Sequence, residues 1–256
     1  MTLLLTLLLA ATAPPVLDLA RVRLVDLTHA FGADTLYWPT SPSAFELRTL
    51  HRGPTGAGFF YSAYSFCAPE HGGTHLDAPV HFAEGRRAAD SLPLEQLVAP
   101  AVVIDASARA EMNPLYRLTR EDVLAWEQRR GRIEPGTIVL LRTGWGRRWP
   151  DRKAYLGDDT PGDASRLRFP SFGAESARLL LERRIAALGV DTASIDYGPS
   201  AGFEVHVLVN GADVPAFENV ANLEALPERG AFVIALPMKI AGGSGGPLRI
   251  VALVPR

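Results

Sequence analysis

The chain has 256 residues, 47% of them hydrophobic and 21% charged, and its 26 basic and 28 acidic side chains leave a formal net charge of −2. This balance, without a basic stripe along the sequence, argues against a nucleic acid partner. The length suits one domain with a sizeable core. The single cysteine, Cys67, excludes an internal disulfide, and we expect it to be a small buried side chain.

Residues 1–13 form an apolar run that ends in Ala11-Thr12-Ala13. Such a run before small residues is typical of a secretory signal peptide, so we predict cleavage near Ala13 and export to the periplasm or beyond, with residues 14–256 as the mature domain. No Lys or Arg precedes the run, so an N-terminal arm that packs on a partner subunit of a cytoplasmic protein stays open. The run is too short to span a bilayer, and no other segment is apolar enough for a membrane helix.

A first strand is predicted at residues 22–27, followed by a long irregular region at residues 31–58 that is rich in Pro, Gly, Ser and Thr. Long loops without secondary structure are usually functional. Five aromatic residues in or just after this region are expected either to wall a pocket for a flat apolar substrate or to fill the core: Tyr37, Trp38, Phe59, Phe60 and Tyr61.

In the middle of the chain, predicted strands alternate with helices, whereas the C-terminal part is rich in strands. Thr119 and Asp122 have the spacing of a capping box, which predicts a helix that runs to about residue 130. A helix at residues 174–188 is expected to stop at Gly189, and residues 144–170 to form a surface lid or an oligomer contact. The remaining predicted elements are strands at residues 101–105, 137–142, 231–240 and 248–254, a strand and turn at residues 190–196, and a short helix at residues 204–209. This order indicates one α/β domain with a mixed sheet.

Three of the six histidines and an aspartate lie within the eleven residues His71-Gly-Gly-Thr-His75-Leu-Asp77-Ala-Pro-Val-His81. Imidazole together with carboxylate suits Zn²⁺, Mn²⁺ or Fe²⁺ better than Ca²⁺ or Mg²⁺. His75 and Asp77 are two residues apart, so on an extended segment they point to one face, and the glycines before them let His71 turn toward the same point. The alternative is a polar turn with solvated histidines. The density of ligands favours a site for a divalent metal.

This stretch matches the H-x-G-T-H-x-D-x-P-x-H signature of the metal-dependent cyclase family, which includes bacterial kynurenine formamidase and isatin hydrolase. Matching segments continue over most of the chain: Asp26-Leu-Thr-His29, Arg142-Thr-Gly-Trp145, Gly189 to Asp196, His206, Phe217-Glu218-Asn219, Leu236-Pro-Met-Lys239 and Gly245-Gly-Pro-Leu-Arg249. The resemblance implies the swivelling β/β/α fold in a single domain. It also implies a homodimer or homotetramer and, for the formamidases, a place in tryptophan catabolism.

The resemblance extends the candidate ligand set to His206 and Glu218. In the formamidase-like members, the positions that match Asp77 and Glu218 bridge two metal ions. Those matching His71 and His75 complete one site, and those matching His81 and His206 complete the other. The isatin-hydrolase-like members resemble this with a single manganese. The expected cofactor is therefore Zn²⁺ or Mn²⁺, as one or two ions.

The predicted reaction is hydrolysis of a C–N bond in a small aromatic amide, formamide or lactam. A metal lowers the pKa of bound water from about 15.7 to about 7, which supplies hydroxide for attack on a carbonyl carbon. His81 and Glu218 are the expected catalytic groups for proton transfer. A lactone hydrolase, a polyketide-type cyclase on the same fold and a non-catalytic metal-binding protein stay open. Where many relatives carry Phe-Pro-Gly, this chain has Phe169-Pro-Ser171-Phe172, which leaves the formamidase substrate itself open.

Residues 242–246, Gly-Gly-Ser-Gly-Gly, match the G-x-S-x-G pattern of a serine hydrolase. That pattern requires a helix after the serine, with an acidic residue and then a histidine later in the chain. A strand is predicted here instead, and neither Asp nor His lies beyond Ser244. We therefore interpret the segment as a tight loop between two strands.

Overall fold

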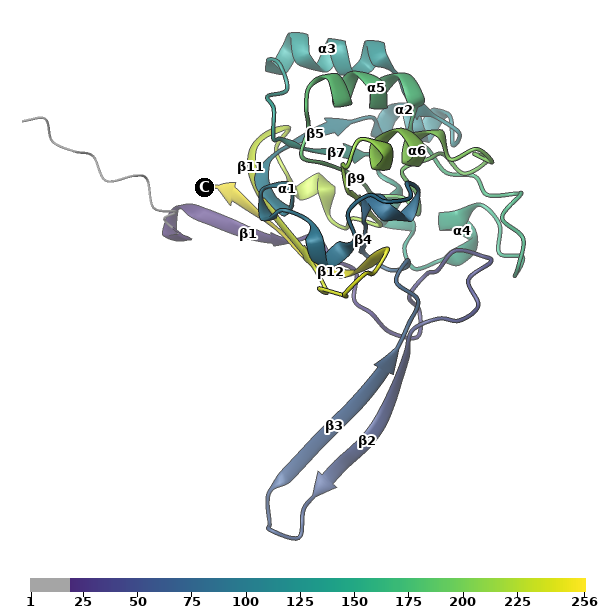
Figure 1. The fold of residues 1–256 in the computed structure, drawn as a ribbon, viewed down its shortest axis with the longest axis vertical. Coiled ribbons are helices and arrows are strands. Elements are labelled where there is room, and N and C mark those ends of the chain that lie inside the picture. Colours follow the sequence, from purple (N-terminus) through teal and green to yellow (C-terminus); the bar gives the residue numbers. More distant parts are fainter. Residues whose placement is uncertain (1–18) are drawn as a thin grey trace, which may run out of the picture.

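The computed structural model describes residues 19–256, so the predicted leader at residues 1–13 lies outside the described part of the chain. A mixed sheet forms the centre of the molecule (Figure 1), in the order β1-β12-β11-β5-β7-β9-β10-β4. Strand β4 also pairs with β12, which closes the sheet into a ring of seven strands with β1 outside it. The strands are β1 (Val22–Asp26), β4 (His75–Asp77), β5 (Val98–Asp105), β7 (Ile138–Arg142), β9 (Ala187–Val190), β10 (Ala216–Glu218), β11 (Arg229–Pro237) and β12 (Gly245–Pro255). The predicted α/β domain with a mixed sheet is confirmed.

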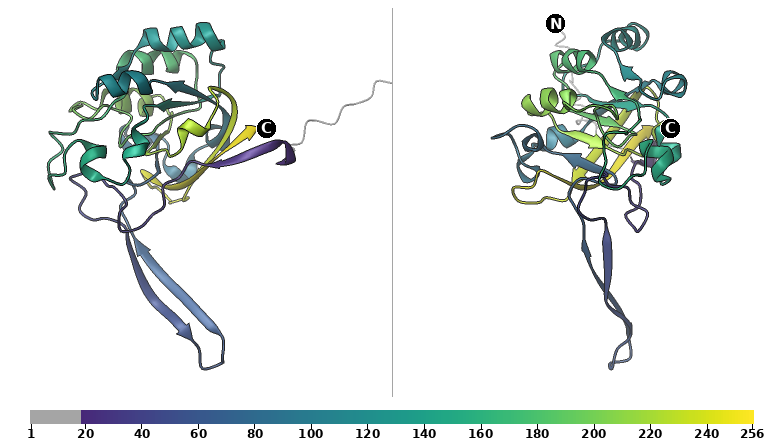
Figure 2. Two further views of the ribbon diagram at one scale, coloured as in Figure 1. Left: turned by 180° about the vertical axis from the view of Figure 1, so that it is seen from behind. Right: turned by 90° about the vertical axis from the view of Figure 1, so that its right-hand side faces the viewer.

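Helices cover the outer side of the parallel strands β5, β7, β9 and β10 (Figures 1 and 2). The main ones are α3 (Arg120–Arg130), α5 (Ala174–Glu182) and α6 (Glu204–Gly211). Shorter elements are α1 (Leu94–Leu97), α2 (Ser107–Met112), α4 (Arg152–Leu156), the 3-10 turns Leu19–Arg21, Pro79–His81, Ala89–Ser91, Trp145–Arg148 and Leu223–Ala225, and a strand pair of β6 (Arg117–Leu118) and β8 (Ser171–Phe172). Among residues 19–256, no helix has the length and apolar character needed to span a bilayer.

The central strands are buried on both faces, so they contribute side chains to two hydrophobic cores. On β7, Ile138 and Leu140 join the cluster on the inner side of the ring, whereas Val139 and Leu141 join the cluster beneath the helices. Trp126 of α3 belongs to the second cluster, and its indole Nε1 donates to the carbonyl of Val103 (3.0 Å). This explains why β7 is a continuous apolar run rather than an alternating one.

The helix predicted at residues 174–188 is too long. Helix α5 ends at Glu182, and residues Ala187–Val190 are β9, paired with β7 and β10. A short apolar run gives no reliable sign of helix or strand. Gly189, expected as a helix stop, lies inside β9, where an added Cβ would be 2.5 Å from Leu140 Cδ2. The capping box of Thr119 and Asp122 is confirmed.

The irregular region predicted at residues 31–58 is wrong for its second half. Residues Glu46–Pro54 (β2) and Phe60–Cys67 (β3) form a long antiparallel hairpin that leaves the body of the molecule (Figures 1 and 2). Its tip turns at Gly58, whose φ of 85° favours glycine. The density of aromatic side chains after this turn, which favours a strand, was the overlooked signal. Cys67, expected to be buried, is exposed at the end of β3.

The insert at residues 144–170 is more than a surface lid. Its side chains Trp145, Tyr155 and Phe169 are fully buried in a third cluster, which also includes Leu36 from the loop before the hairpin. The Trp145 indole donates to the carbonyl of Tyr155 (2.7 Å). The insert and the loop before the hairpin therefore form one packed layer beside residues 71–81, the candidate metal-ligand stretch.

Candidate metal centre

The metal-ligand stretch runs from a turn into β4 and then into the 3-10 turn Pro79–His81. Gly73 has a φ of 57°, and at Gly72 an added Cβ would lie 2.1 Å from the Tyr37 ring. The turn therefore needs glycine at both positions. Strand β10 pairs with β4 in a register that sets Glu218 opposite His75. This pairing brings the distant carboxylate to the stretch.

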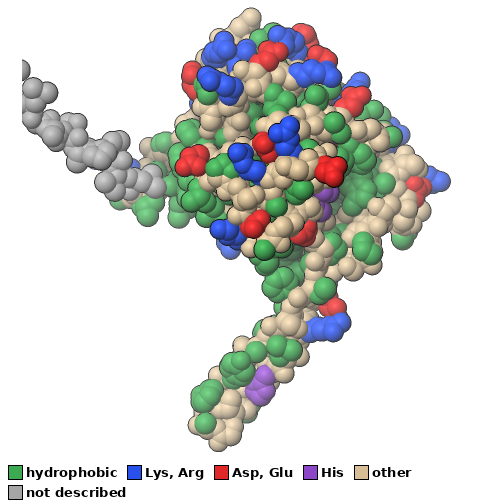
Figure 3. Space-filling model, viewed as in Figure 1, with side chains coloured by type: hydrophobic (Ala, Val, Ile, Leu, Met, Phe, Trp, Pro, Cys, Tyr) green, Lys and Arg blue, Asp and Glu red, His purple; other side chains and the backbone are tan. Residues whose placement is uncertain are grey.

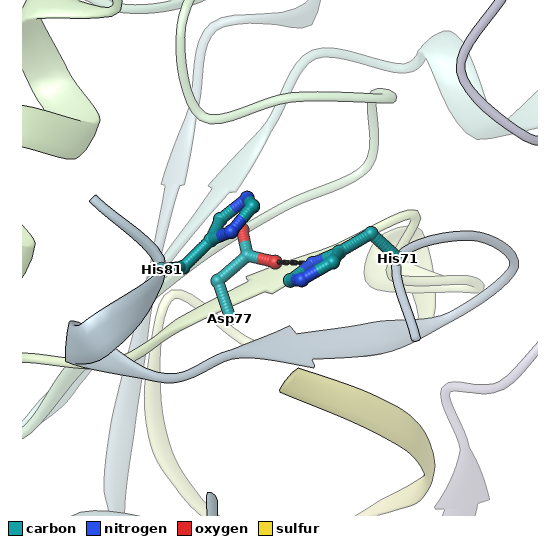
Figure 4. A group of neighbouring side chains, drawn as sticks. All are labelled: His71, Asp77 and His81. Carbon is teal, nitrogen blue, oxygen red and sulfur yellow. Dashed lines mark hydrogen bonds and ion pairs between the residues drawn. The ribbon is translucent and has the colours of Figure 1, made fainter. Parts of the chain in front are cut away.

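The other five side chains predicted as ligands gather around Asp77, and Figure 4 shows His71 and His81 beside it. His71 Nδ1 lies 2.6 Å from Asp77 Oδ1, and the His71 and His81 rings stack with centroids 3.8 Å apart. His206 Nε2 lies 3.3 Å from Asp77 Oδ2 and 3.2 Å from Glu218 Oε1. Two groups have one ligand atom from each member within 4.8 Å of the others: His71, Asp77 and His81, and His75, Asp77 and Glu218. The arrangement fits the prediction, and the role of each residue as a ligand stays a prediction.

His75 offers an imidazole nitrogen that lacks a hydrogen-bond partner. Its Nδ1 is 3.0 Å from the carbonyl of Gly73, which can only accept, so Nδ1 carries the proton. The other nitrogen, Nε2, is buried and makes no hydrogen bond, although it lies 3.2 Å from Asp77 Oδ1 and 3.6 Å from Glu218 Oε2. The ring is therefore oriented with Nε2 toward the two carboxylates and Nδ1–H toward a backbone carbonyl, which is the usual orientation of a metal-binding histidine. The residues present therefore fit a divalent metal.

The charges of the cluster also favour a cation. Asp77 and Glu218 are both fully buried, and burial together with the charge of Asp77 raises the pKa of Glu218. Burial opposes the charged form of Asp77 as well, but the neighbouring imidazoles, His75 first, hold its pKa well below the usual range. Burial lowers the pKa of His75, yet the two carboxylates outweigh it and raise that pKa to about 9. Two buried carboxylates side by side need positive charge between them.

A cavity of about 340 Å³ opens over the cluster. The side chains of Tyr37, Trp38, Phe82 and Phe203 supply aromatic surface to its lining, and Leu36 and Leu156 add aliphatic surface. The expectation that Tyr37 and Trp38 wall a pocket is therefore confirmed. For Phe59, Phe60 and Tyr61 it is wrong, because the hairpin carries them away from the body and leaves them 58%, 66% and 50% exposed.

Asp196 is a site residue that sequence reasoning did not single out. Its Oδ2 accepts from His206 Nδ1 (2.7 Å), and its two oxygens also accept from the backbone N–H groups of Val205 and His206 (3.0 and 3.1 Å). It thus holds both the first turn of α6 and the ring of His206. Phe203 was missed too, because its entry into the pocket depends on the turn before α6. The segment that ends at Asp196 did resemble the family, which was the available signal.

Residues 25–197 match the protein-family model named Cyclase. The chain belongs to the Cyclase family. The isatin hydrolase of Roseibium aggregatum, a similar Cyclase-type protein, is 36% identical over 249 residues, which cover 92% of this chain and 93% of the relative. The kynurenine formamidase of Salinibacter ruber is 26% identical, with 90% and 97% covered.

Solved structures similar to this Cyclase-family chain include isatin hydrolase A from Ralstonia solanacearum. That structure has a TM-score of 0.83 and 36% identity, and the match covers 96% of this chain and all of that one. An isatin hydrolase bound to the product analogue thioisatinate gives a TM-score of 0.82 at 31% identity, with 93% and 94% covered. Near-complete coverage on both sides confirms the predicted family and fold.

Proposed function

We propose that the protein is a metal-dependent hydrolase that cleaves the C–N bond of a small aromatic amide, formamide or lactam. The observation that carries the proposal is the unpartnered His75 Nε2 beside two buried carboxylates, on the floor of an aromatic cavity. The similar isatin hydrolase and kynurenine formamidases support the substrate class. Isatin itself is the first substrate to test, because the isatin hydrolases match at higher identity.

Six side chains would hold the metal: His71, His75, Asp77, His81, His206 and Glu218. We propose Zn²⁺ or Mn²⁺, whose preference for imidazole and carboxylate ligands fits this set. When bound, such an ion acts as a Lewis acid and makes hydroxide available near neutral pH. The two groups of ligands share Asp77, which supports a site for two neighbouring ions, and the alternative is a single ion. Metal-to-protein stoichiometry by mass spectrometry separates the two.

The side chains of the chain itself position the substrate and move protons. Trp38 and Phe203 offer flat surfaces on which an aromatic ring can stack, and they shield the cluster from bulk water. Burial lowers the pKa of His81 to about 4, so its ring is neutral at pH 7 and has a lone pair for a metal ion or for a proton. If His81 does not bind the ion, its ring would accept a proton from the attacking water and return it to the leaving nitrogen, and Glu218 is the alternative base.

The proposal is tested with metal-free and reconstituted protein on isatin, N-formylkynurenine and simple lactones. We expect turnover of an aromatic C–N substrate only after Zn²⁺ or Mn²⁺ is restored, and loss of metal and turnover together in His75→Ala. The exposed Glu224→Gln serves as a control that keeps both. Full activity after exhaustive metal removal, or turnover of lactones alone, would contradict the proposal.

We also propose a homodimer or homotetramer, in which a second copy covers the hairpin. Phe60, Tyr64 and Phe66 share one face of β3, with Leu47 opposite Phe66, and all four side chains are 43–66% exposed. Figure 3 shows hydrophobic side chains along the hairpin. A hairpin this apolar on one face is only marginally stable in water when nothing covers it. Figures 1 and 2 show that the hairpin points away from its own body.

A second copy can supply what the hairpin lacks. Leu24 on β1 and Leu236 on β11, the two strands that flank β12, are 61% and 45% exposed. One chain thus offers both an apolar arm and apolar sheet surface, and a two-fold pair can bury both at once. This supports self-association rather than a different partner.

A further inference from the structure

We propose that Glu70, acting through Ser244, fixes the tautomer of His71 so that its Nδ1 is the metal-binding atom. A continuous set of short polar contacts links the three residues to the cluster. Glu70 Oε2 lies 2.6 Å from Ser244 Oγ, Ser244 Oγ lies 2.9 Å from His71 Nε2, and His71 Nδ1 lies 2.6 Å from Asp77 Oδ1. The inference rests on the proposed metal site and makes Glu70 and Ser244 positioning residues.

The direction of these hydrogen bonds follows from a count of protons. A carboxylate only accepts, and a serine hydroxyl has a single hydrogen. Glu70 Oε2 receives that hydrogen across 2.6 Å, and it also accepts from the backbone N–H of Ser244 (3.0 Å). Ser244 Oγ therefore has only lone pairs left to offer His71. Nε2 of His71 must carry a proton and donate it.

A neutral imidazole with a proton on Nε2 has its lone pair on Nδ1. That nitrogen is the one that faces Asp77 in Figure 4. His75 and His206 present the other nitrogen to the cluster, because their Nδ1 atoms lie against Gly73 O and Asp196 Oδ2 and their Nε2 atoms face the carboxylates. The His71 ring therefore needs a different hydrogen-bond partner to orient it, and Ser244, held by Glu70, is that partner.

The glycines of residues 242–246 make this contact possible. An added Cβ at Gly243 would lie 2.7 Å from Glu70 Oε1, and one at Gly245 would lie 2.6 Å from His71 Cε1. The loop is also tied to the metal-ligand stretch, since Ala78 N donates to the carbonyl of Ser244 (2.8 Å). The pattern that resembles a nucleophile elbow thus serves to bring one hydroxyl against one imidazole.

The test compares Ser244→Ala, Ser244→Thr and a control, Asp90→Asn, in otherwise full-length protein. Asp90 Oδ1 accepts from Gly242 N (3.2 Å), so it anchors the same loop without touching His71. The first readout is the dissociation constant of Mn²⁺ or Zn²⁺ for metal-free protein, from competition with a chromophoric chelator. The second is the tautomer of His71 in metal-free, ¹⁵N-histidine-labelled protein, read from the ¹⁵N shifts of its two ring nitrogens.

We expect wild-type protein to carry the His71 proton on Nε2. Ser244→Ala should weaken metal binding about 10–100-fold, as is usual when a group that orients a ligand is lost. Ser244→Thr, which restores the hydroxyl, and Asp90→Asn should bind metal as wild type does. An unprotonated Nε2 in the wild type, or unchanged affinity in Ser244→Ala, would overturn the inference.

The outcome is separate from that of the proposed function. If wild-type protein binds metal and shows the expected tautomer but hydrolyses no amide, the proposed function fails and the positioning role stands. Where Ser244→Ala does not fold, Glu70→Gln gives the same test. The glutamine amide can donate to Ser244 Oγ, which leaves the serine hydrogen free to point toward His71 Nε2. A mixture of tautomers in Glu70→Gln supports the inference, and an unchanged Nε2 proton contradicts it.

Discussion

The His206 ring lies between the carboxylate of Asp196 on one side and those of Asp77 and Glu218 on the other. Its Nδ1 lies 2.7 Å from Asp196 Oδ2, and its Nε2 faces Asp77 and Glu218 at 3.3 and 3.2 Å. Burial opposes a charged ring, but the hydrogen bonds to these acids raise the pKa of His206 well above its ordinary value. The Asp196 carboxylate fixes which nitrogen points inward, and so prepares the ring to bind a cation.

Asp196→Asn should therefore weaken metal binding about 10–100-fold. Each carboxylate oxygen already accepts from at least one N–H group, so the amide nitrogen of asparagine would face a donor in either orientation. Metal affinity of the metal-free protein is the measurement. Ser200→Ala, which removes only a 3.2 Å contact to Asp196 Oδ1, should bind normally. Equal affinity in Asp196→Asn and wild type would show that Asp196 only supports the helix.

Glu218→Gln should reduce kcat by more than about 100-fold, a loss in the range expected for a positioned proton-transfer or metal-binding group. The side chain keeps its shape, so Oε1 can still accept from the N–H of Ile195 (2.8 Å) and the fold should persist. Circular dichroism and thermal unfolding check the fold, and metal analysis shows whether binding fails with turnover. A near-normal kcat in the variant with metal bound would show that Glu218 is needed neither for proton transfer nor for metal binding.

The sequence predicts the near half of the site better than the far half. His71, His75, Asp77 and His81 lie within eleven residues, so their shared chemistry is visible without a fold. Glu218 reaches them only because β10 pairs antiparallel with β4, and no local pattern encodes that register. Only the family resemblance pointed to Glu218 and His206.

The lack of a local sequence pattern also explains which parts of the fold were not predicted. Strand β7 was predicted closely because burial on both faces leaves a continuous run of branched apolar residues, whereas the four-residue run of β9 was taken for the end of a helix. The hairpin was missed because residues 31–58 are rich in Pro, Gly, Ser and Thr, and because β2 is exposed along most of its length, so that no buried face imposes an apolar alternation. Asp196 was not assigned a role because a lone aspartate before a helix has many ordinary uses. Contacts between distant segments, rather than local propensities, complete this site.

Trp38→Leu should raise KM for an aromatic substrate about 5–30-fold, equivalent to the loss of about 1–2 kcal/mol of stacking and apolar contact. Trp38 lies between Phe169 and Phe203, with ring centroids 6.3 and 6.2 Å away, so its plane is set by neighbours on two segments. Because it is remote from proton transfer, kcat should change little. Trp38→Phe should recover most of the KM, whereas no difference between the leucine and phenylalanine variants would rule out stacking.

A partly buried ion pair gives a pH-dependent contribution to stability. Both carboxylate oxygens of Glu127 accept from the Arg183 guanidinium at 2.9 Å, which joins α3 to the end of α5. The hydrogen bonds to Arg183 lower the pKa of Glu127, although partial burial opposes this. A pKa that is lower in the folded state means that the stabilisation is full above the unfolded value, about 4.3, and is lost as pH falls below it.

Glu127→Gln should therefore lower the free energy of unfolding by about 1–2 kcal/mol at pH 7, and the difference from wild type should shrink toward pH 3. Urea unfolding at several pH values measures this. Glu175→Gln, at an exposed pair with Arg178, should stay close to wild type throughout, because exposed pairs contribute little. A destabilisation of Glu127→Gln that is equal at pH 7 and pH 3 would show that charge is not its cause.

The last prediction concerns the hairpin and the second copy proposed to cover it. In the double variant Phe60→Ser and Tyr64→Ser, two large side chains are lost from the apolar face, where they are 66% and 43% exposed. If a second copy buries this face, the variant should fall to the monomer mass of 27.6 kDa in light scattering. Tyr61 points to the opposite face of the same strand, so Tyr61→Ser removes a similar side chain and should keep the wild-type mass. An unchanged mass in the double variant, or a wild-type monomer at micromolar concentration, would mean that the aromatic face is covered in some other way.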